Sequence, residues 1–190
     1  MNTIAVVFPG IGYTCQKPLL YYLIKWLKSK NINVVELDYT SLGKEKMRGN
    51  SELIKEAVQD GVEIYNHKVD PGAMEKADRV IFVGKSIGSA VATHVYNQLS
   101  RDNKQKTELI LLTPLEETFE VPVSEEAMVF HGNKDPWADT GKIIDLCKKN
   151  GIMLQMIKDG NHSLETGDIN LDLENISRII KSAIAKLECK

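Results

Sequence analysis

The feature that most constrains this chain is a strand pattern that runs directly into a serine flanked by glycines. Val80-Ile81-Phe82-Val83 is continuously β-branched and aromatic with no polar side, which is typical of a strand covered on both faces of a parallel sheet. Gly84-Lys85-Ser86-Ile87-Gly88 follows, and apolar residues then recur at helical spacing as far as Leu99. In a G-x-S-x-G turn, small residues let the backbone reverse sharply and lift the serine oxygen clear of the sheet at a helix N-terminus. Ser86 is therefore a candidate nucleophile.

The same turn allows two other interpretations. A phosphate-binding P-loop would need a glycine five residues before Gly84, and Arg79 stands there, so we exclude a nucleotide site. In the second interpretation the glycines only permit a tight turn, and Ser86 only caps the helix that follows. That interpretation stays open on the turn alone.

Strand and helix patterns alternate along the chain. This alternation predicts one domain over residues 1–190, with an α/β fold: a doubly wound, mostly parallel six-stranded sheet with helices on both faces. Asp139 or Thr140 is expected to cap a helix that Asn150-Gly151 ends. The other expected helices cover 18–30, 53–66, 87–99 and 173–187, and the expected strands cover 4–8, 32–38, 80–83, 109–112, 127–130 and 152–157.

Three connecting segments bear on function. Pro9-Gly10-Ile11-Gly12 follows the first strand, and its glycines free the backbone to turn amides outward, which makes it a candidate oxyanion loop. A dinucleotide fingerprint would need a further glycine at Cys15, so that reading is poor. Residues 114–126 are irregular and too few for a helical cap, so an open pocket is expected over Ser86. Residues 41–50 form a polar loop, in which we interpret Lys44, Lys46 and Arg48 as solvated surface rather than an anion site.

Three residue types needed for nucleophilic catalysis occur in one order. A serine hydroxyl needs an imidazole to accept its proton, and the imidazole needs a carboxylate to hold its tautomer. Ser86, Asp135 and His162 each lie just past a predicted strand, in the order Ser, Asp, His. Because the carboxyl ends of parallel strands meet at one sheet edge, the fold could bring all three together.

With these residues in place, the whole chain resembles the α/β-hydrolase superfamily, in particular its small lidless members near dienelactone hydrolases and short-chain carboxylesterases or thioesterases. The matching pieces are the elbow at residues 84–88, the acid loop His131-Gly132-Asn133-Lys134-Asp135-Pro136-Trp137, the Gly160-Asn161-His162 turn and the Pro9-Gly10-Ile11-Gly12 loop. The family usually has a histidine at the position of Pro9. This difference affects the conformation expected for the loop.

The resemblance implies a role for each matching residue. Ser86 would be the nucleophile, Asp135 the acid and His162 the base, and the backbone amides of Ile11 and Ile87 would form the oxyanion hole. An unperturbed imidazole titrates near pH 6.5, so activity is expected to fall below about pH 6 to 7, with Asp135 raising that value.

Other residues compete for these roles or for the pocket. Asp139 is close enough to Asp135 to compete as the acid. Cys15 is interpreted as a buried filler because no elbow surrounds it. The rival histidines are His67, His94 and His131, and the candidate pocket residues are Tyr13, Phe119, Trp137 and Leu164.

Composition limits the remaining possibilities. The formal net charge of −2 gives no electrostatic signal for nucleic acid or an anionic membrane, so neither partner is expected. Cys15, Cys147 and Cys189 have no metal-binding spacing, and no metal or cofactor is expected. No signal segment is evident, which predicts a cytoplasmic protein with reduced thiols. The sequence carries no signal for the oligomeric state.

The favoured function is a serine hydrolase that cleaves a small ester or thioester through an acyl-enzyme. Two alternatives are kept: a dienelactone-type hydrolase of cyclic esters, and a non-catalytic α/β-hydrolase scaffold that acts as a binding module. A dienelactone-type site would need a cation for the substrate carboxylate, and no arginine is clearly placed for it.

Overall fold

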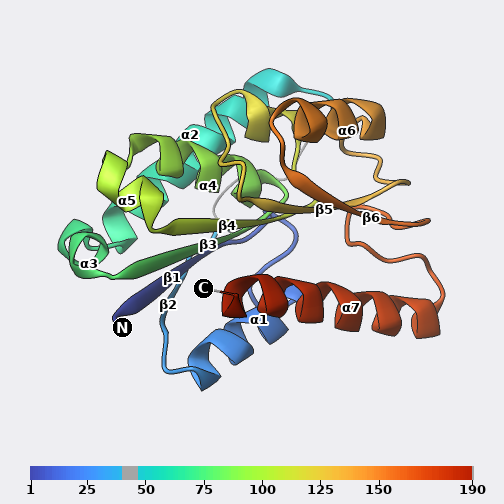
Figure 1. Ribbon diagram of the computed structural model, residues 1–190. Coiled ribbons are helices and arrows are strands. Elements are labelled where there is room, and N and C mark those ends of the chain that lie inside the picture. The colour runs from blue at the N-terminus through green and yellow to red at the C-terminus, as the bar shows by residue number, and fades with distance from the viewer. Residues whose placement is uncertain (40–46, 190) are drawn as a thin grey trace.

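A six-stranded parallel sheet forms the centre of the part of the chain that the computed structural model describes, residues 1–39 and 47–189 (Figure 1). Its strand order is β2-β1-β3-β4-β5-β6, and every neighbouring pair is parallel. The predicted doubly wound α/β fold is confirmed. The strands are β1 (Thr3–Phe8), β2 (Asn33–Glu36), β3 (Arg79–Lys85), β4 (Thr107–Leu112), β5 (Met128–Gly132) and β6 (Met153–Ile157).

Helices cover both faces of the sheet. Helices α1 and α7 lie together under one face, and α2, α4 and α6 lie over the other (Figure 1). The helices are α1 (Pro18–Ser29), α2 (Ser51–Lys68), α3 (Pro71–Lys76), α4 (Ile87–Gln98), α5 (Arg101–Gln105), the 3-10 turn η1 (Glu116–Phe119), α6 (Thr140–Lys149) and α7 (Ile169–Glu188).

Strand β1 explains why the sequence shows an unbroken apolar run where an exposed sheet would show alternation. Val6 and Phe8 pack into the core beneath α2 and α4, while Ala5 and Val7 pack toward α1 and α7. Since both faces of the strand are covered, apolar residues are favoured on both. The same holds for β3, whose Val80, Ile81, Phe82 and Val83 are fully buried.

Most differences from the sequence prediction lie at element ends. Helix α7 begins at Ile169 rather than 173, because the Asp168 side chain accepts the Asn170 and Leu171 amides and caps it. The short helices α3 and α5 were not predicted, since each is too short to display an apolar period. The segment 114–126 contains only the single turn η1 and no helical cap. Of the polar loop 41–50, Lys44 and Lys46 lie outside the described residues.

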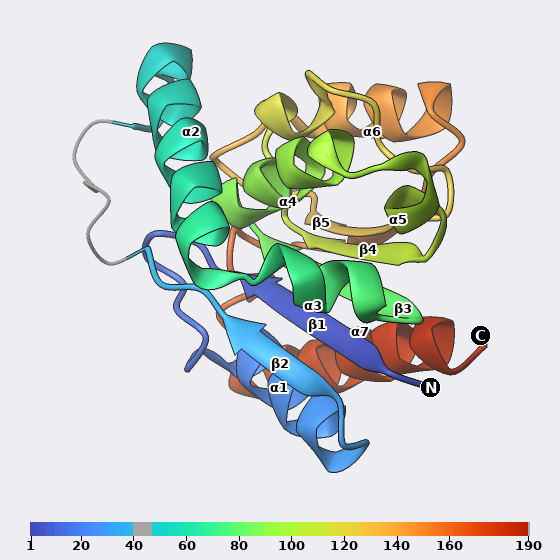
Figure 2. The ribbon, with the colours of Figure 1, turned by 90° about the vertical axis from the view of Figure 1, so that its left-hand side faces the viewer.

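The strand order fixes where a site can form. The chain passes from β1 to β2 on one side and then returns to β3 on the other, so the connections diverge between β1 and β3. Figure 2 shows β1 and β2 side by side, with α1 beneath them and both termini at the opposite end from the strand tips. In parallel sheets of this type, ligands bind in the crevice outside the carboxyl ends of the strands at this point.

The turn from β3 into α4 fits tightly against β1. A Cβ atom at Gly88 would overlap the backbone carbonyl groups of Phe8 and Pro9, and one at Gly84 would lie 2.6 Å from the Ser89 Cα. These contacts are with backbone, which cannot move aside as a flexible side chain could. Both glycines are therefore required by close approach.

We predict that Gly88→Ala destabilises the fold by about 3 kcal/mol, because the added methyl group must displace β1 or the helix start. Urea unfolding measures the effect. Gly12→Ala is the matched control, since a Cβ at Gly12 would meet no atom within 4 Å. Equal stability of the two variants would show that the elbow does not pack as tightly as described.

Candidate active site

Ser86 occupies the turn between β3 and α4 in a strained backbone conformation. Its φ is 58° and its ψ is −125°, a positive-φ geometry that non-glycine residues rarely adopt. Its amide donates to the Leu112 carbonyl at 2.9 Å, which anchors the turn to β4. The Ser86 side chain makes no capping hydrogen bond to α4, so the interpretation of this residue as a simple helix cap is not supported.

His162 reaches the serine from the loop that follows β6. Its Nε2 lies 2.7 Å from Ser86 Oγ. The side-chain oxygen of Asn161 accepts the amides of Ser163 at 2.7 Å and Glu165 at 3.2 Å, which closes the turn around the histidine. The Asn161 side chain is therefore committed to shaping the loop.

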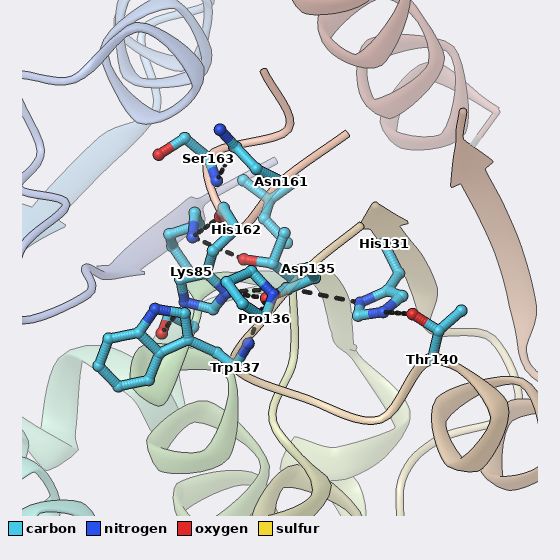
Figure 3. Close-up of polar contacts among 12 residues, drawn as sticks. Lys85, His131, Asp135, Pro136, Trp137, Thr140, Asn161, His162 and Ser163 are labelled. Atoms are coloured by element: carbon cyan, nitrogen blue, oxygen red, sulfur yellow. Dashed lines mark hydrogen bonds and ion pairs between the residues drawn. The ribbon is translucent and has the colours of Figure 1, made fainter. Parts of the chain in front are cut away.

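Asp135 follows β5 and lies on the far side of the imidazole. Its two carboxylate oxygens are 2.8 and 3.0 Å from His162 Nδ1, and the Trp137 amide donates to Oδ1 at 2.8 Å (Figure 3). The Lys134 amide donates to the Gly160 carbonyl at 2.9 Å, so the loop of the carboxylate and the loop of the histidine are joined. The side chain of Asp135 is fully buried.

These contacts select one tautomer of the histidine. A carboxylate only accepts hydrogen bonds, so Nδ1 carries a proton that it donates to Asp135. Nε2 is then the free acceptor for the Ser86 hydroxyl. The indole ring of Trp137 stacks on the imidazole at a centroid distance of 5.4 Å and an interplanar angle of 26°, which limits rotation of the ring.

Burial and charge set the protonation of this cluster. Burial raises the pKa of Asp135, but the hydrogen bond and charge of His162 and the Trp137 amide outweigh it and hold that pKa below its usual value. Burial and then the positive charge of Lys85 lower the pKa of His162 to about 4, against the opposing effect of Asp135. The sequence-based expectation of a histidine pKa at or above 6.5 is therefore wrong, because it counted Asp135 and not burial or Lys85.

The rival acid and two rival histidines have local roles. Asp139 accepts the Lys142 amide at 3.0 Å and caps α6. Nδ1 of His67 and of His94 each lie 2.8 Å from a carbonyl one turn earlier in the same helix. None of these three contacts Ser86.

His131 and Cys15 differ from the first three rivals. His131 is fully buried in β5, with Nε2 3.2 Å from Thr140 Oγ1 and Nδ1 3.8 Å from Asp135 Oδ2, so it lies behind the carboxylate (Figure 3). Cys15 contacts the Leu37 carbonyl, and burial raises its thiol pKa to about 12, which disfavours a thiolate.

A cavity of about 300 Å³ opens over Ser86. Ile11 and Ile87, whose amides were predicted to form an oxyanion hole, both line it, and the Ile87 amide opens α4, where helical amides have no intrahelical partner. Within the described residues, the Ile11 amide donates no hydrogen bond.

Tyr13 and Trp137 also line the cavity, as predicted. Phe119 and Leu164 do not, because each packs into a core layer. The cavity is also lined by residues that were not predicted from the sequence, namely Met47, Ile54, Lys85, Leu115 and Ser163. No sequence signal marks either Ile54 or Leu115 as a cavity wall, since helical spacing assigns Ile54 to packing and Leu115 lies in the irregular segment 114–126.

No candidate metal centre accompanies the site. Within residues 1–39 and 47–189, no group of three or more His, Cys, Asp or Glu side chains could hold a metal ion. In the same residues, no helix combines the length and apolar character needed to cross a membrane.

Comparison with protein families decides the assignment of the chain. Residues 2–186 match a family described as alpha/beta hydrolase domain. The chain belongs to this family of α/β hydrolases. A comparison with curated proteins found no significant sequence match.

Solved structures share the fold of this α/β hydrolase at low sequence identity. A Xanthomonas campestris protein assigned to the alpha/beta hydrolase superfamily has a TM-score of 0.67 and 17% identity, over 97% of this chain and 99% of that one. A second protein from Xanthomonas campestris, described as an α/β serine hydrolase without a lid, has a TM-score of 0.59 and 18% identity, over 95% and 82% of the two chains. The Bacillus cereus carboxylesterase has a TM-score of 0.56 and 16% identity, over 94% and 89%. At these identities the likeness establishes the fold alone.

The lowered pKa of His162 makes the stability of this α/β hydrolase depend on pH. As pH falls below 6.5, the unfolded chain binds a proton at this residue before the folded protein does, so acidification favours unfolding until pH falls below the folded value near 4. We predict that His162 accounts for a loss of about 2 kcal/mol between pH 7 and pH 5. Urea unfolding at both pH values should give a smaller loss for His162→Gln than for the wild type, with His67→Gln as control. An unchanged loss in His162→Gln would contradict the lowered pKa.

Proposed function

We propose that this α/β hydrolase cleaves small esters or thioesters through a covalent acyl-enzyme on Ser86. One observation carries the proposal: the continuous hydrogen-bonded chain from Ser86 Oγ through the His162 ring to the Asp135 carboxylate. A serine hydroxyl becomes a good nucleophile when an oriented imidazole can accept its proton. Nε2 is in position to do so at 2.7 Å.

In the first half-reaction, Ser86 Oγ attacks the substrate carbonyl carbon while His162 Nε2 takes the hydroxyl proton. A bond forms between Oγ and carbon, and the negative charge that develops on the carbonyl oxygen is stabilised by the Ile11 and Ile87 amides. The intermediate then expels the alcohol or thiol, which takes the proton from His162. Asp135 stabilises the transient imidazolium by its negative charge.

Water completes the second half-reaction. His162 accepts a proton from a water molecule as its oxygen attacks the acyl carbon, and the same amides stabilise the second oxyanion. The bond between the acyl carbon and Ser86 Oγ breaks, and His162 returns the proton to Oγ. The products are a carboxylic acid and the free enzyme.

The walls of the cavity favour a small neutral acyl group. The apolar surface comes from Ile11, Ile54, Ile87 and Leu115. No helical cap encloses further volume, because the segment 114–126 contains only the single turn η1. The Lys85 ammonium donates hydrogen bonds to Thr113 Oγ1 and to the His162 carbonyl. Arg48 Nε donates to the Pro136 carbonyl at 2.9 Å. These bonds give less support to a dienelactone-type reaction, which needs a cation for the substrate carboxylate.

A non-catalytic scaffold is the other alternative. A binding module has no need of a strained serine, a histidine with one fixed tautomer and a buried carboxylate in line. The positive φ of Ser86 and the two hydrogen bonds of the His162 ring are features that catalysis requires and binding does not.

We predict that Ser86→Ala and His162→Ala each lower kcat/KM for p-nitrophenyl acetate by at least about 10⁴-fold, and that the double variant resembles either single variant. The residues act as one unit, so their losses do not add. Cys15→Ala is the control, because its thiol lies outside the cavity over Ser86 and should leave the rate unchanged.

Two outcomes would contradict this assignment. If Ser86→Ala retained esterase activity near the wild-type rate, Ser86 would not be the nucleophile. If the two single losses multiplied in the double variant, Ser86 and His162 would act in separate steps.

Substrate size gives a further prediction. Each buried methylene contributes about 0.8 kcal/mol, but a lidless cavity of about 300 Å³ encloses few of them. We expect kcat/KM for p-nitrophenyl esters to be highest for short acyl chains, of about two to six carbons, and to show no rise at a detergent micelle interface. A rate that keeps rising to laurate or palmitate would reveal a deeper or gated pocket.

A further inference from the structure

Lys85 is a fully buried cation within the nucleophile turn. Its ammonium donates to Thr113 Oγ1 at 2.6 Å and to the His162 carbonyl at 2.8 Å, and it lies 4.8 Å from the centroid of the Tyr13 ring. Figure 3 shows Lys85 beside His162. The residue before the serine therefore holds the backbone of the histidine that faces the serine.

The position is costly for a cation. Within the described residues, no carboxylate lies within ion-pair distance of the Lys85 ammonium. The charges that act on it from neighbouring loops are Asp135 and Glu165, and it acts in turn on His162 and His131. Burial lowers the pKa of Lys85 to about 7. A buried charge with no ion-pair partner carries a desolvation cost that two hydrogen bonds only partly offset, so stability gives little reason for a lysine here.

We propose that Lys85 is a positioning residue, whose ammonium fixes the His162 loop against the turn that holds Ser86 and places a positive charge beside His162. The inference rests on the proposed function, since it assigns a task within the same site. Lys85 and Ser86 are consecutive, so the hydrogen bond to the His162 carbonyl ties the base to the nucleophile through one side chain. A small displacement of the ring would lengthen the 2.7 Å contact that proton transfer needs.

The two parts of the proposal have separate consequences. Loss of the hydrogen bond frees the His162 loop and lowers the rate at every pH. Loss of the positive charge makes it easier to protonate His162, so the acid limb of the pH profile moves up toward the ordinary imidazole value near 6.5. A lysine that served only to fill the core would not move that limb.

The test measures the rate at which an alkyl fluorophosphonate modifies Ser86 between pH 4 and 8.5. In this reaction Oγ forms a bond to phosphorus, fluoride leaves and His162 takes the serine proton, so the rate reports the pair without a known substrate. For Lys85→Met we expect a rate about 10- to 100-fold lower at the plateau and an acid limb at higher pH, with a cooperative melting transition that shows the variant still folds.

Two further variants separate the contributions. Lys85→Gln keeps an N–H donor and loses the charge, so its acid limb should move as in Lys85→Met while its plateau rate stays closer to the wild type. Lys30→Met is the matched control, because Lys30 pairs with Glu188 on the surface and should leave both features unchanged.

The outcomes separate a failure of the proposed function from a failure of the role of Lys85. No modification of the wild type would overturn the proposed function itself. A modified wild type with an unmoved acid limb and plateau in Lys85→Met would overturn only the role of Lys85. If neither Lys85 variant folds, NMR titration of His162 in the wild type gives the answer: we expect its ring signals to show a second inflection near pH 7 as Lys85 loses its proton, and a single inflection would contradict the coupling.

Discussion

The packing of the β3–α4 turn against β1 is the constraint on which the rest of the site depends. Because Gly88 meets the carbonyl groups of Phe8 and Pro9 with no room for a side chain, the start of α4 is held directly beside the loop that follows β1. Within this turn, Ser86 adopts a positive φ of 58°. This close contact thus holds the start of α4 beside the Ile11 loop, and Ser86, Ile87 and Ile11 line the same cavity.

The parallel sheet supplies the remaining groups. Strands β5 and β6 end beside β3 and β4 at the same edge, and the loops that follow them are joined by the hydrogen bond from the Lys134 amide to the Gly160 carbonyl. Asp135 and His162 therefore form a connected unit. Lys85 joins that unit to the β3–α4 turn, so the side chains of Ser86, Asp135 and His162 belong to one hydrogen-bonded network.

Local pattern was sufficient for the strands and for the order Ser, Asp, His, because apolar runs and glycine-rich turns leave signals in short stretches of sequence. The choice of Asp135 over Asp139 agrees with the structure, where Asp139 caps α6. The lowered pKa of His162 could not be predicted, since it arises from burial and from Lys85, 77 positions away. The wall formed by Ile54 and Leu115 was also missed, because Ile54 has the spacing of a helix residue that fills a core and Leu115 lies in an irregular segment with no period.

The central claim is that Ser86 attacks the substrate and carries the acyl group. Peptide mapping by mass spectrometry, after the wild type has been mixed with p-nitrophenyl acetate and quenched in acid during turnover, tests this most directly. The account predicts one added acetyl group, on the peptide that contains Ser86, which disappears once the substrate is exhausted. An acetyl group on Cys15 or a lysine, or turnover with no acetylated Ser86 at any time, would contradict it.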